Sequence, residues 1–320
     1  MTTEARPAAL GRAGEGSVAT RNRPVRRQGR ATPYLFLAPF LVLFIGFVLL
    51  PAVYGIYVSL FDYNYLLPGK PFVGLSNYID LFTSDSRDAE PFWRAMRATG
   101  IFTVLSVPLL LVFPLGVALL LNRAFPGRTF FRAVFFAPYV LGVAVVGVLF
   151  RFILEPTIGI VNYYLRALGV QDPPDWTTST PWVWVTLVGM TVWWTIGFNA
   201  IIYLAGLQDI SPDLYEAAEV DGANKWQQFR FVTIPGLRPV LLFVLTVTIL
   251  ASANMFGQAY ITTKGAPSNE TRTAIMYIAE TGLRENRQGA AAAMGYILAA
   301  ALILISLLNF RLFRSDGEES

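Results

Sequence analysis

The sequence predicts an all-helical membrane protein with six transmembrane helices, and three observations support this prediction. Of the 320 residues, 54% are hydrophobic and only 14% are charged, which is too apolar for a soluble domain of this length. Several long runs lack Asp, Glu, Lys and Arg, and each is about long enough to cross a hydrocarbon core of roughly 30 Å. Basic residues recur in alternate connections. The predicted spans are residues 34–61, 98–122, 131–153, 181–206, 238–262 and 288–312.

The segment before the first span, residues 1–31, is rich in Arg, Ala, Gly and Thr and poor in large apolar residues. This composition predicts a disordered basic tail at the cytoplasmic membrane surface, in preference to a nucleic-acid-binding arm. The first span is too long for a secretory signal and lacks a following small-residue cleavage site, so we expect it to be retained. Residues 32–315 are the predicted transmembrane domain, and residues 316–320 a C-terminal tail.

Basic residues predict the orientation. With six spans, the basic tail, the second and fourth connections and the C-terminal tail lie on one side, which the positive-inside rule assigns to the cytoplasm. Both termini are then cytoplasmic. Arginines near the other side, Arg94, Arg97, Arg284 and Arg287, make this bias incomplete. The inner set after the first tail is Arg123, Arg128, Arg132, Lys225, Arg230, Arg238, Arg311 and Arg314.

A polar interruption, residues 209–239, separates the fourth and fifth spans and predicts two short helices. Ser211 is a suitable N-cap, Pro212 suits the first helical position, and Asp213 complements the positive helix end. Gly222 permits a turn, and Pro235 stops the helix that follows. This pattern indicates an element that docks on a partner; a connector lying on the membrane surface is the alternative.

The loop resembles the EAA loop of permease subunits of ATP-binding-cassette (ABC) importers. The matching residues are Glu216-Ala217-Ala218, Asp221-Gly222-Ala223, Ile234-Pro235 and Pro239. The resemblance implies that the first short helix fits a groove on a cytoplasmic ATPase. Glu216 would then make a polar contact, Ala217 and Ala218 would allow close packing, and Gly222 would set the angle between the helices. Asp221 has the alternative role of capping the second helix with Asn224.

Four further segments resemble carbohydrate-uptake ABC permeases, such as the maltose-transporter permease subunits. In the last of these segments, Ala266 replaces the family's second glycine. The resemblance implies an inner-membrane, multi-pass subunit that works in the lipid bilayer with a second permease, an ATPase dimer and an extracytoplasmic binding protein. The four segments are residues 72–78, residues 132–138, residues 155–162 and residues 256–267.

Polar and aromatic residues within the spans are candidates for the substrate path, because burying them in lipid is costly. Aromatic faces and amides suit a sugar. Trp and Tyr also mark membrane interfaces, and Asn can join helices by hydrogen bonds, so structural roles are the alternative. No basic residue lies within the charge-free runs, which favours a neutral carbohydrate. The candidates are Trp193, Trp194, Asn199, Asn254, Gln258 and Tyr260.

Other functions are less consistent with the composition. The chain has no Cys, no His and no phosphate-binding Gly-x-x-x-x-Gly-Lys-Ser/Thr loop, so we expect no catalytic residue, metal site or cofactor in this chain; ATP and magnesium would bind to the partner ATPase. An ion-coupled transporter usually needs ionisable groups at membrane depth, and the charge-free runs contain none. A membrane-embedded enzyme would have no His, no Cys and no pair of carboxylates within the spans for its chemistry. Importers of glycerol phosphate, polyamines or peptides remain alternatives within the ABC class. We expect no nucleic-acid partner.

Overall fold

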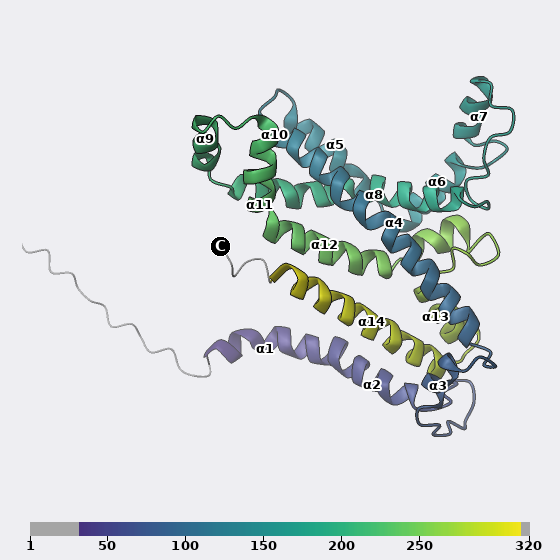
Figure 1. Ribbon diagram of the computed structural model, residues 1–320. Helices are drawn as coiled ribbons and strands as arrows, with labels where there is room; N and C mark the ends of the chain where they lie inside the picture. The colour runs from purple at the N-terminus through teal and green to yellow at the C-terminus, as the bar shows by residue number, and fades with distance from the viewer. Residues whose placement is uncertain (1–31, 315–320) are drawn as a thin grey trace, which may run out of the picture. The chain divides into compact units, whose positions relative to one another are not determined.

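The computed structural model describes residues 32–314, and its regular elements are helices (Figure 1). The all-helical prediction is therefore confirmed for this part of the chain. The predicted tails, residues 1–31 and 316–320, lie outside the described residues. Two compact units, Met1–Pro51 and Ala52–Ser320, are described separately below. Four helices are long and apolar enough to cross a membrane, and six spans result if each of two bent helix pairs counts as one.

The first candidate span, Tyr34–Ser59, contains a π-helical turn. This turn, η1 (Ile45–Leu49), lies directly before Pro51, and the Leu50 N–H donates to the carbonyl of Ile45, five residues back. Because Pro51 has no N–H to donate, the usual hydrogen-bond pattern is interrupted here, and the wider turn accommodates the interruption. Two α-helices flank the turn, α1 (Thr32–Phe44) and α2 (Leu50–Ser59).

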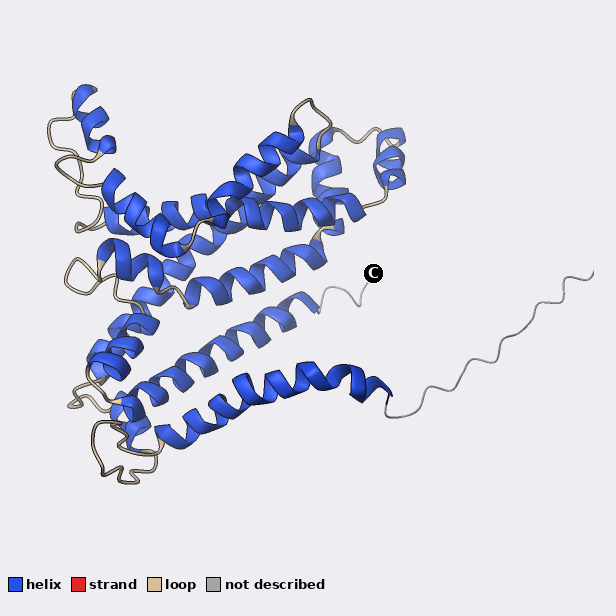
Figure 2. Ribbon diagram, turned by 180° about the vertical axis from the view of Figure 1, so that it is seen from behind, coloured by secondary structure: helices blue, strands red, loops and turns tan. Residues whose placement is uncertain are grey.

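Two long helices of the second unit, α4 (Ala89–Asn122) and α8 (Trp182–Asp209), pack side by side and form its centre (Figures 1 and 2). Helix α12 (Arg238–Ala253) packs along α4, and α14 (Gln288–Arg314) contacts α12. Large side chains such as Phe102 are fully buried here, and van der Waals packing stabilises helix association where the surroundings are lipid.

The second unit has two ends, which we name after short helices. At the α9 end, α8 ends at Asp209 and leads into α9 (Pro212–Val220). At the α7 end, α8 begins near α7 (Ile160–Ala167), as Figure 1 shows. The remaining helices are α3 (Ser76–Ile79), η2 (Asp80–Phe82), α5 (Arg128–Val140), α6 (Val143–Ile153), α10 (Lys225–Gln228), η3 (Phe229–Thr233), α11 (Ile234–Gly236), η4 (Ala259–Thr263), α13 (Ala274–Ala279) and η5 (Glu280–Arg284).

Two predicted spans are not single continuous helices. Residues 131–153 form α5 and α6, which meet at an angle of 95° after Leu141 and Gly142. The predicted span 238–262 is wrong beyond Ala253, because α12 ends there and a separate π-helical turn, η4, follows. At its other end α12 is bent by 67° from the helical segment Lys225–Gly236.

Three long helices, α4, α8 and α14, fit the second, fourth and sixth predicted spans more closely. Helix α4 begins at Ala89, nine residues before the predicted 98, because its first turns carry Glu90, Arg94 and Arg97, which a search for uncharged runs excludes. Helices α8 and α14 contain most of the predicted residues 181–206 and 288–312.

A buried ion pair joins the beginnings of α4 and α14 at the α7 end. Arg287 donates two hydrogen bonds to the Asp88 carboxylate, at 2.7 and 2.5 Å, and the Tyr277 hydroxyl donates to it at 3.2 Å. Burial raises the pKa of Asp88, but the hydrogen bonds and charge of Arg287 outweigh burial, so the pKa lies below its ordinary value. The carboxylate therefore stabilises the fold in its charged form.

Candidate functional site

A central cavity of about 450 Å³ lies among α4, α8, α12 and the residues that follow α12. Four of the six predicted substrate-path residues line it, Trp194, Asn199, Asn254 and Gln258. The structure thus brings together residues that are up to 64 positions apart in the sequence (258 − 194). Volume and mixed lining are typical of a small-molecule site. Its other lining residues include Phe102, Leu110, Tyr139, Val143, Thr191, Thr195, Phe198, Thr248, Ser252 and Phe256.

Three aromatic rings form one wall of the cavity. The Tyr139 ring, near the end of α5, stacks on the Phe198 ring of α8, with centroids 4.5 Å apart and planes 16° apart. Tyr139 also stacks on Trp194, with the two ring centroids 6.2 Å apart. The Trp194 Nε1–H donates to the Leu141 carbonyl at 2.9 Å, which fixes the ring against the break between α5 and α6. Flat apolar surfaces of this kind suit the C–H face of a sugar ring.

Amides and hydroxyls line the rest of the cavity. Asn199 is 7% exposed and donates to the Leu110 carbonyl at 3.3 Å, and Asn254 donates to the Leu250 carbonyl at 2.8 Å. Each amide oxygen retains its acceptor capacity in these arrangements. Thr195 donates to the Thr191 carbonyl at 2.8 Å. The cavity therefore offers acceptors and donors without a charged side chain among its lining residues.

The other two predicted path residues lie elsewhere. Trp193 lines an apolar groove on α4 and α8, and its ring lies 5.5 Å from that of Phe150. Tyr260 stacks on Phe256, with centroids 5.0 Å apart, and its ring lines a second cavity at the α7 end. The central cavity therefore brings together four of the six candidates, and the part played by Trp193 and Tyr260 in a substrate path stays a prediction.

The sequence analysis did not single out Tyr139, Thr195 or Phe198 as cavity residues. Tyr139 directly follows the segment 132–138, which was singled out only for its resemblance to carbohydrate permeases. Phe198 lies four residues after Trp194 on α8, so helical periodicity from that tryptophan would have placed both on one face.

The loop at the α9 end has the predicted two-helix form. The Ser211 side chain accepts from the Asp213 N–H at 3.3 Å and Pro212 occupies the first helical position, as predicted. Gly222 has φ +80°, a left-handed conformation that glycine adopts without steric cost. The chain can therefore turn sharply after α9.

Asn224, and not Asp221, caps the second helix of the loop. The Asn224 side chain accepts from the Gln227 N–H at 3.0 Å, and the Gln227 side chain accepts from the Asn224 N–H at 2.8 Å. Asp221 lies at the C-terminal cap of α9, where its own N–H donates to the Ala217 carbonyl. The capping role considered for Asp221 is therefore wrong. The helical segment ends one residue after Pro235, at Gly236.

Helix α9 presents an exposed surface while one hydrogen bond anchors it. The Tyr215 hydroxyl lies 3.0 Å from Thr233 Oγ1, which joins α9 to η3. Glu216 and Ala217 are exposed, Ala218 and Ala223 are half-buried, and Glu216 makes no hydrogen bond or ion pair within residues 32–314. Large apolar side chains are also exposed around the loop: Leu214, Val220, Trp226 and Phe231. Exposed apolar side chains beside a polar loop suit an interaction surface.

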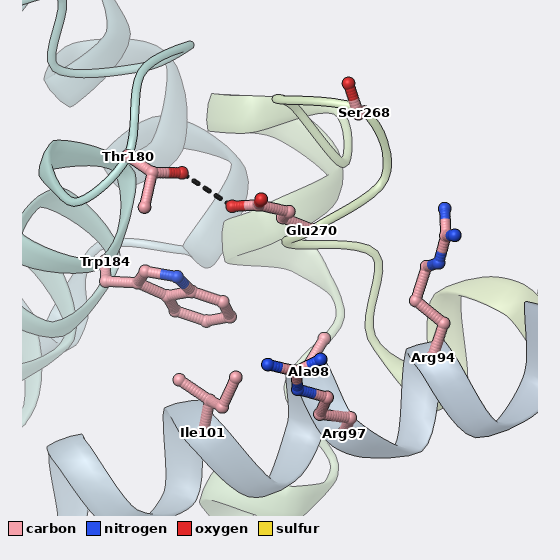
Figure 3. Close-up of a pocket in the computed structure, with 8 residues that line it drawn as sticks. All are labelled: Arg94, Arg97, Ala98, Ile101, Thr180, Trp184, Ser268 and Glu270. Carbon is pink, nitrogen blue, oxygen red and sulfur yellow. Dashed lines mark hydrogen bonds between the residues drawn. The ribbon is translucent and has the colours of Figure 1, made fainter.

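A cavity of about 520 Å³ opens at the α7 end, between α4, α8 and the loop before α13 (Figure 3). The Thr180 hydroxyl donates to the Glu270 carboxylate at 2.5 Å, and this pair faces Trp184 and the α4 guanidinium groups of Arg94 and Arg97 in Figure 3. Four residues of this loop have left-handed backbone conformations: Lys264, Gly265, Ser268 and Asn269.

An all-helical membrane unit with an internal polar cavity and an exposed two-helix loop defines a transport subunit. The model of one family, described as binding-protein-dependent transport system inner membrane component, matches residues 91–315. The chain belongs to this family, so it is an inner-membrane transport component and not an enzyme. The resemblance noted from the loop residues is thereby confirmed.

Individual relatives are similar over nearly their whole length. The chain is 34% identical to the arabinooligosaccharides transport system permease protein AraP of Bacillus subtilis (strain 168), covering 90% of this chain and 91% of the relative. It is 31% identical to the lactose transport system permease protein LacF of Rhizobium radiobacter, covering 91% and 97%. A bacterial alginate ABC transporter, solved in complex with an alginate pentasaccharide-bound periplasmic protein, contains a chain with TM-score 0.75 and 25% identity, covering 89% of this chain and 94% of that one.

Proposed function

We propose that this chain forms half of the translocation path for a sugar or oligosaccharide in an ATP-driven importer. The lining of the central cavity carries the proposal, because it combines the Tyr139, Trp194 and Phe198 rings with the amides of Asn199 and Gln258. Rings of this kind pack on the apolar faces of sugars, and amides form hydrogen bonds with their hydroxyls. The names of AraP and LacF, which transport saccharides, support the same substrate class.

The α9 loop is the proposed coupling element. Its first helix would insert into a groove of a cytoplasmic ATPase, with Glu216 making a polar contact and Ala217 allowing close approach. The exposure of these two side chains supports this role. The Tyr215–Thr233 hydrogen bond would transmit a movement of α9 to η3 and so to α12.

The proposed topology has six spans, with the α5–α6 pair and the pair Lys225–Gly236 and Arg238–Ala253 each counted as one. Both termini and α9 would then be cytoplasmic. The basic residues around α9, Lys225 and Arg230, favour this orientation. The α7 end would face an extracytoplasmic binding protein.

The proposed assembly contains a second, related permease and two ATPase subunits or domains in the same bilayer. ATP and magnesium would bind to the ATPase, and this chain would hold no cofactor. The alginate transporter, solved with its periplasmic protein, supports the binding-protein part of the assembly.

The decisive experiment is a pull-down of the tagged chain in mild detergent from its native cells, followed by mass spectrometry. We expect an ATPase with a phosphate-binding loop, a second permease and a binding protein to co-elute. Recovery of the chain alone, or only as a homo-oligomer after crosslinking, would contradict the importer assignment.

Two variants test the coupling element within the cell. Glu216→Lys and Gly222→Val should abolish uptake while the protein stays in the membrane, since the first reverses an exposed charge and the second places a branched residue at φ +80°. Arg128→Glu, an exposed charge reversal at the α9 end but outside the loop, is the matched control. Normal uptake in both loop variants would contradict the docking role.

A further inference from the structure

A second cavity at the α7 end has an excess of positive charge. Its volume is about 440 Å³, and three basic side chains from three separate elements line it. Arg151 lies in the last turn of α6, Lys264 follows η4, and Arg284 ends η5. The lining residues are Arg151, Tyr260, Ile261, Lys264, Met276, Glu280 and Arg284.

The three cations have no counter-charge of their own. None of them makes a hydrogen bond or ion pair with another residue of the described range 32–314. The one carboxylate in the lining, Glu280, is paired with Arg272, whose guanidinium also lies 4.5 Å from the centre of the Tyr277 ring. Three like charges around one cavity repel one another, so an anion that enters it is stabilised.

Five carboxylates at this end are engaged with groups that do not line this cavity. Asp88 is held by Arg287, Glu90 by Arg94, and Glu285 by Arg87. Glu270 accepts from Thr180 and Glu155 accepts from the backbone N–H groups of residues 157 and 158. The cavity therefore retains its positive charge in the folded chain.

The backbone at Lys264 adds a second observation. Lys264 has φ +53°, a left-handed conformation that is uncommon for a non-glycine residue, and its N–H closes the π-helical turn by donating to the Ala259 carbonyl at 2.8 Å. Strained residues of this kind cluster at ligand sites. Lys264 is both the residue with this backbone conformation and a lining residue of the basic cavity.

The basic cavity adjoins the central cavity along one segment of chain. Phe256 and Gln258 line the central cavity, whereas Tyr260 lines the basic one. The Phe256 and Tyr260 rings stack with their planes 19° apart, so an aromatic pair connects the two sites. The two cavities therefore present aromatic surfaces that touch each other.

We propose that Arg151, Lys264 and Arg284 bind an anionic oxygen group, a carboxylate or a phosphate, carried by the transported solute, while Tyr260 packs against its ring. The inference rests on the proposed function and narrows its substrate class to acidic saccharides. An acidic saccharide differs from the neutral sugar expected from the sequence. The neutral sugar was expected because the charge-free runs contain no basic residue, and Arg151, Lys264 and Arg284 lie outside those runs.

The test is equilibrium binding of trigalacturonate to the purified full-length chain in nanodiscs of neutral phosphatidylcholine. The methyl-esterified trimer, which has the same rings without the charge, is the ligand control. We expect the acid to bind, the ester to bind at least about tenfold more weakly, and the difference to shrink in high salt. A second set of discs contains anionic phosphatidylglycerol, to distinguish a lipid headgroup from a solute.

Charge-neutralising variants locate the site. Arg151→Gln, Lys264→Gln and Arg284→Gln should each weaken binding by about two- to fivefold, the range expected for one exposed charge pair. Arg97→Gln is the matched control, because Arg97 is another guanidinium at the α7 end that lines a different cavity and makes no hydrogen bond or ion pair with a described residue. Binding in this control should be unchanged.

Three outcomes would overturn the inference. The first is equal binding of the acid and its ester, or binding of neither. The second is an equal loss in Arg97→Gln, which would indicate only a general surface potential. The third is loss of trigalacturonate binding in the discs that contain phosphatidylglycerol, which would make the cavity a lipid-headgroup site. In each case the proposed importer function still stands if the pull-down recovers its partners, so the two failures are distinguishable.

Discussion

Replacing Gly197 with alanine tests whether the close approach of α5 and α8 forms the central cavity. A Cβ atom on Gly197 would lie 2.1 Å from the Phe135 carbonyl oxygen and 2.6 Å from the Phe136 Cα, and both are backbone atoms of α5. Ordinary contact begins near 3.4 Å, so the backbone must retreat by 1.3 Å (3.4 − 2.1). Forced displacements of this kind in a packed interior cost about 1–3 kcal/mol.

The same displacement should damage the cavity wall. Tyr139 is part of α5 and stacks on Phe198, one residue after Gly197, with a centroid separation of 4.5 Å. A shift of α5 by more than an ångström opens this stack and moves the Leu141 carbonyl away from Trp194. We therefore expect Gly197→Ala to reduce uptake as well as stability.

Gly189→Ala is the matched control on the same helix. No atom lies within 4 Å of a Cβ built on Gly189, and alanine is a better helix former than glycine by about 1 kcal/mol. The measurements are the midpoint of thermal unfolding of the purified chain and uptake at equal membrane abundance. Gly197→Ala should lower both, and Gly189→Ala should lower neither. A Gly197→Ala protein that melts at or above the parent temperature and transports normally would refute the reasoning.

Two further predictions concern the α7 end and the cavity lining. Asp88→Asn should lower the midpoint of thermal unfolding at pH 7, because Arg287 loses its charged partner. The folded-state pKa of Asp88 lies below its unfolded-state value of about 3.9, so the stability that the carboxylate contributes is complete above that value and is lost as the pH falls through the folded-state pKa. The midpoints of the parent and the variant should therefore converge as the pH falls below about 4. A constant difference down to pH 2 would contradict this. Gln258→Leu should raise the sugar concentration for half-maximal uptake by about fivefold or more, the cost of about one lost hydrogen bond, whereas Trp193→Leu, outside the cavity, should not. Equal effects of the two would contradict the cavity assignment.

Local chemistry explains why the α9 loop was predictable. Ser211, Pro212, Gly222 and Asn224 act through bonds to residues at most three positions away or through their own φ, so sequence spacing alone contains the information. The exposure of Glu216 was predictable for the same reason, because nothing distant in the sequence covers it.

The central cavity was less predictable, because tertiary contacts create it. Residues 133–150 and 239–263 contain no charged residue, and a hydropathy argument cannot place a break within such a run. The bend after Leu141 brings Tyr139 to Phe198, and the end of α12 at Ala253 places Asn254 and Gln258 beside α8. Tyr260 lies two positions after Gln258 and is outside this cavity, and only the packing between helices separates it from Asn254 and Gln258.

The two helix breaks and the cavity have one physical cause. A break within an apolar segment leaves backbone groups unpaired, and at membrane depth this is tolerated only where protein or a polar cavity satisfies them. At the first break the Trp194 indole N–H donates to the Leu141 carbonyl at 2.9 Å, and at the second the Thr273 hydroxyl donates to the Met255 carbonyl at 2.7 Å. Met255 itself lines the cavity, and Leu141 lies two residues from Tyr139 and Val143, which also line it. The chain therefore breaks its helices where side chains from other helices can satisfy the backbone, and those breaks turn amides and aromatic rings inward toward the space that a solute would occupy.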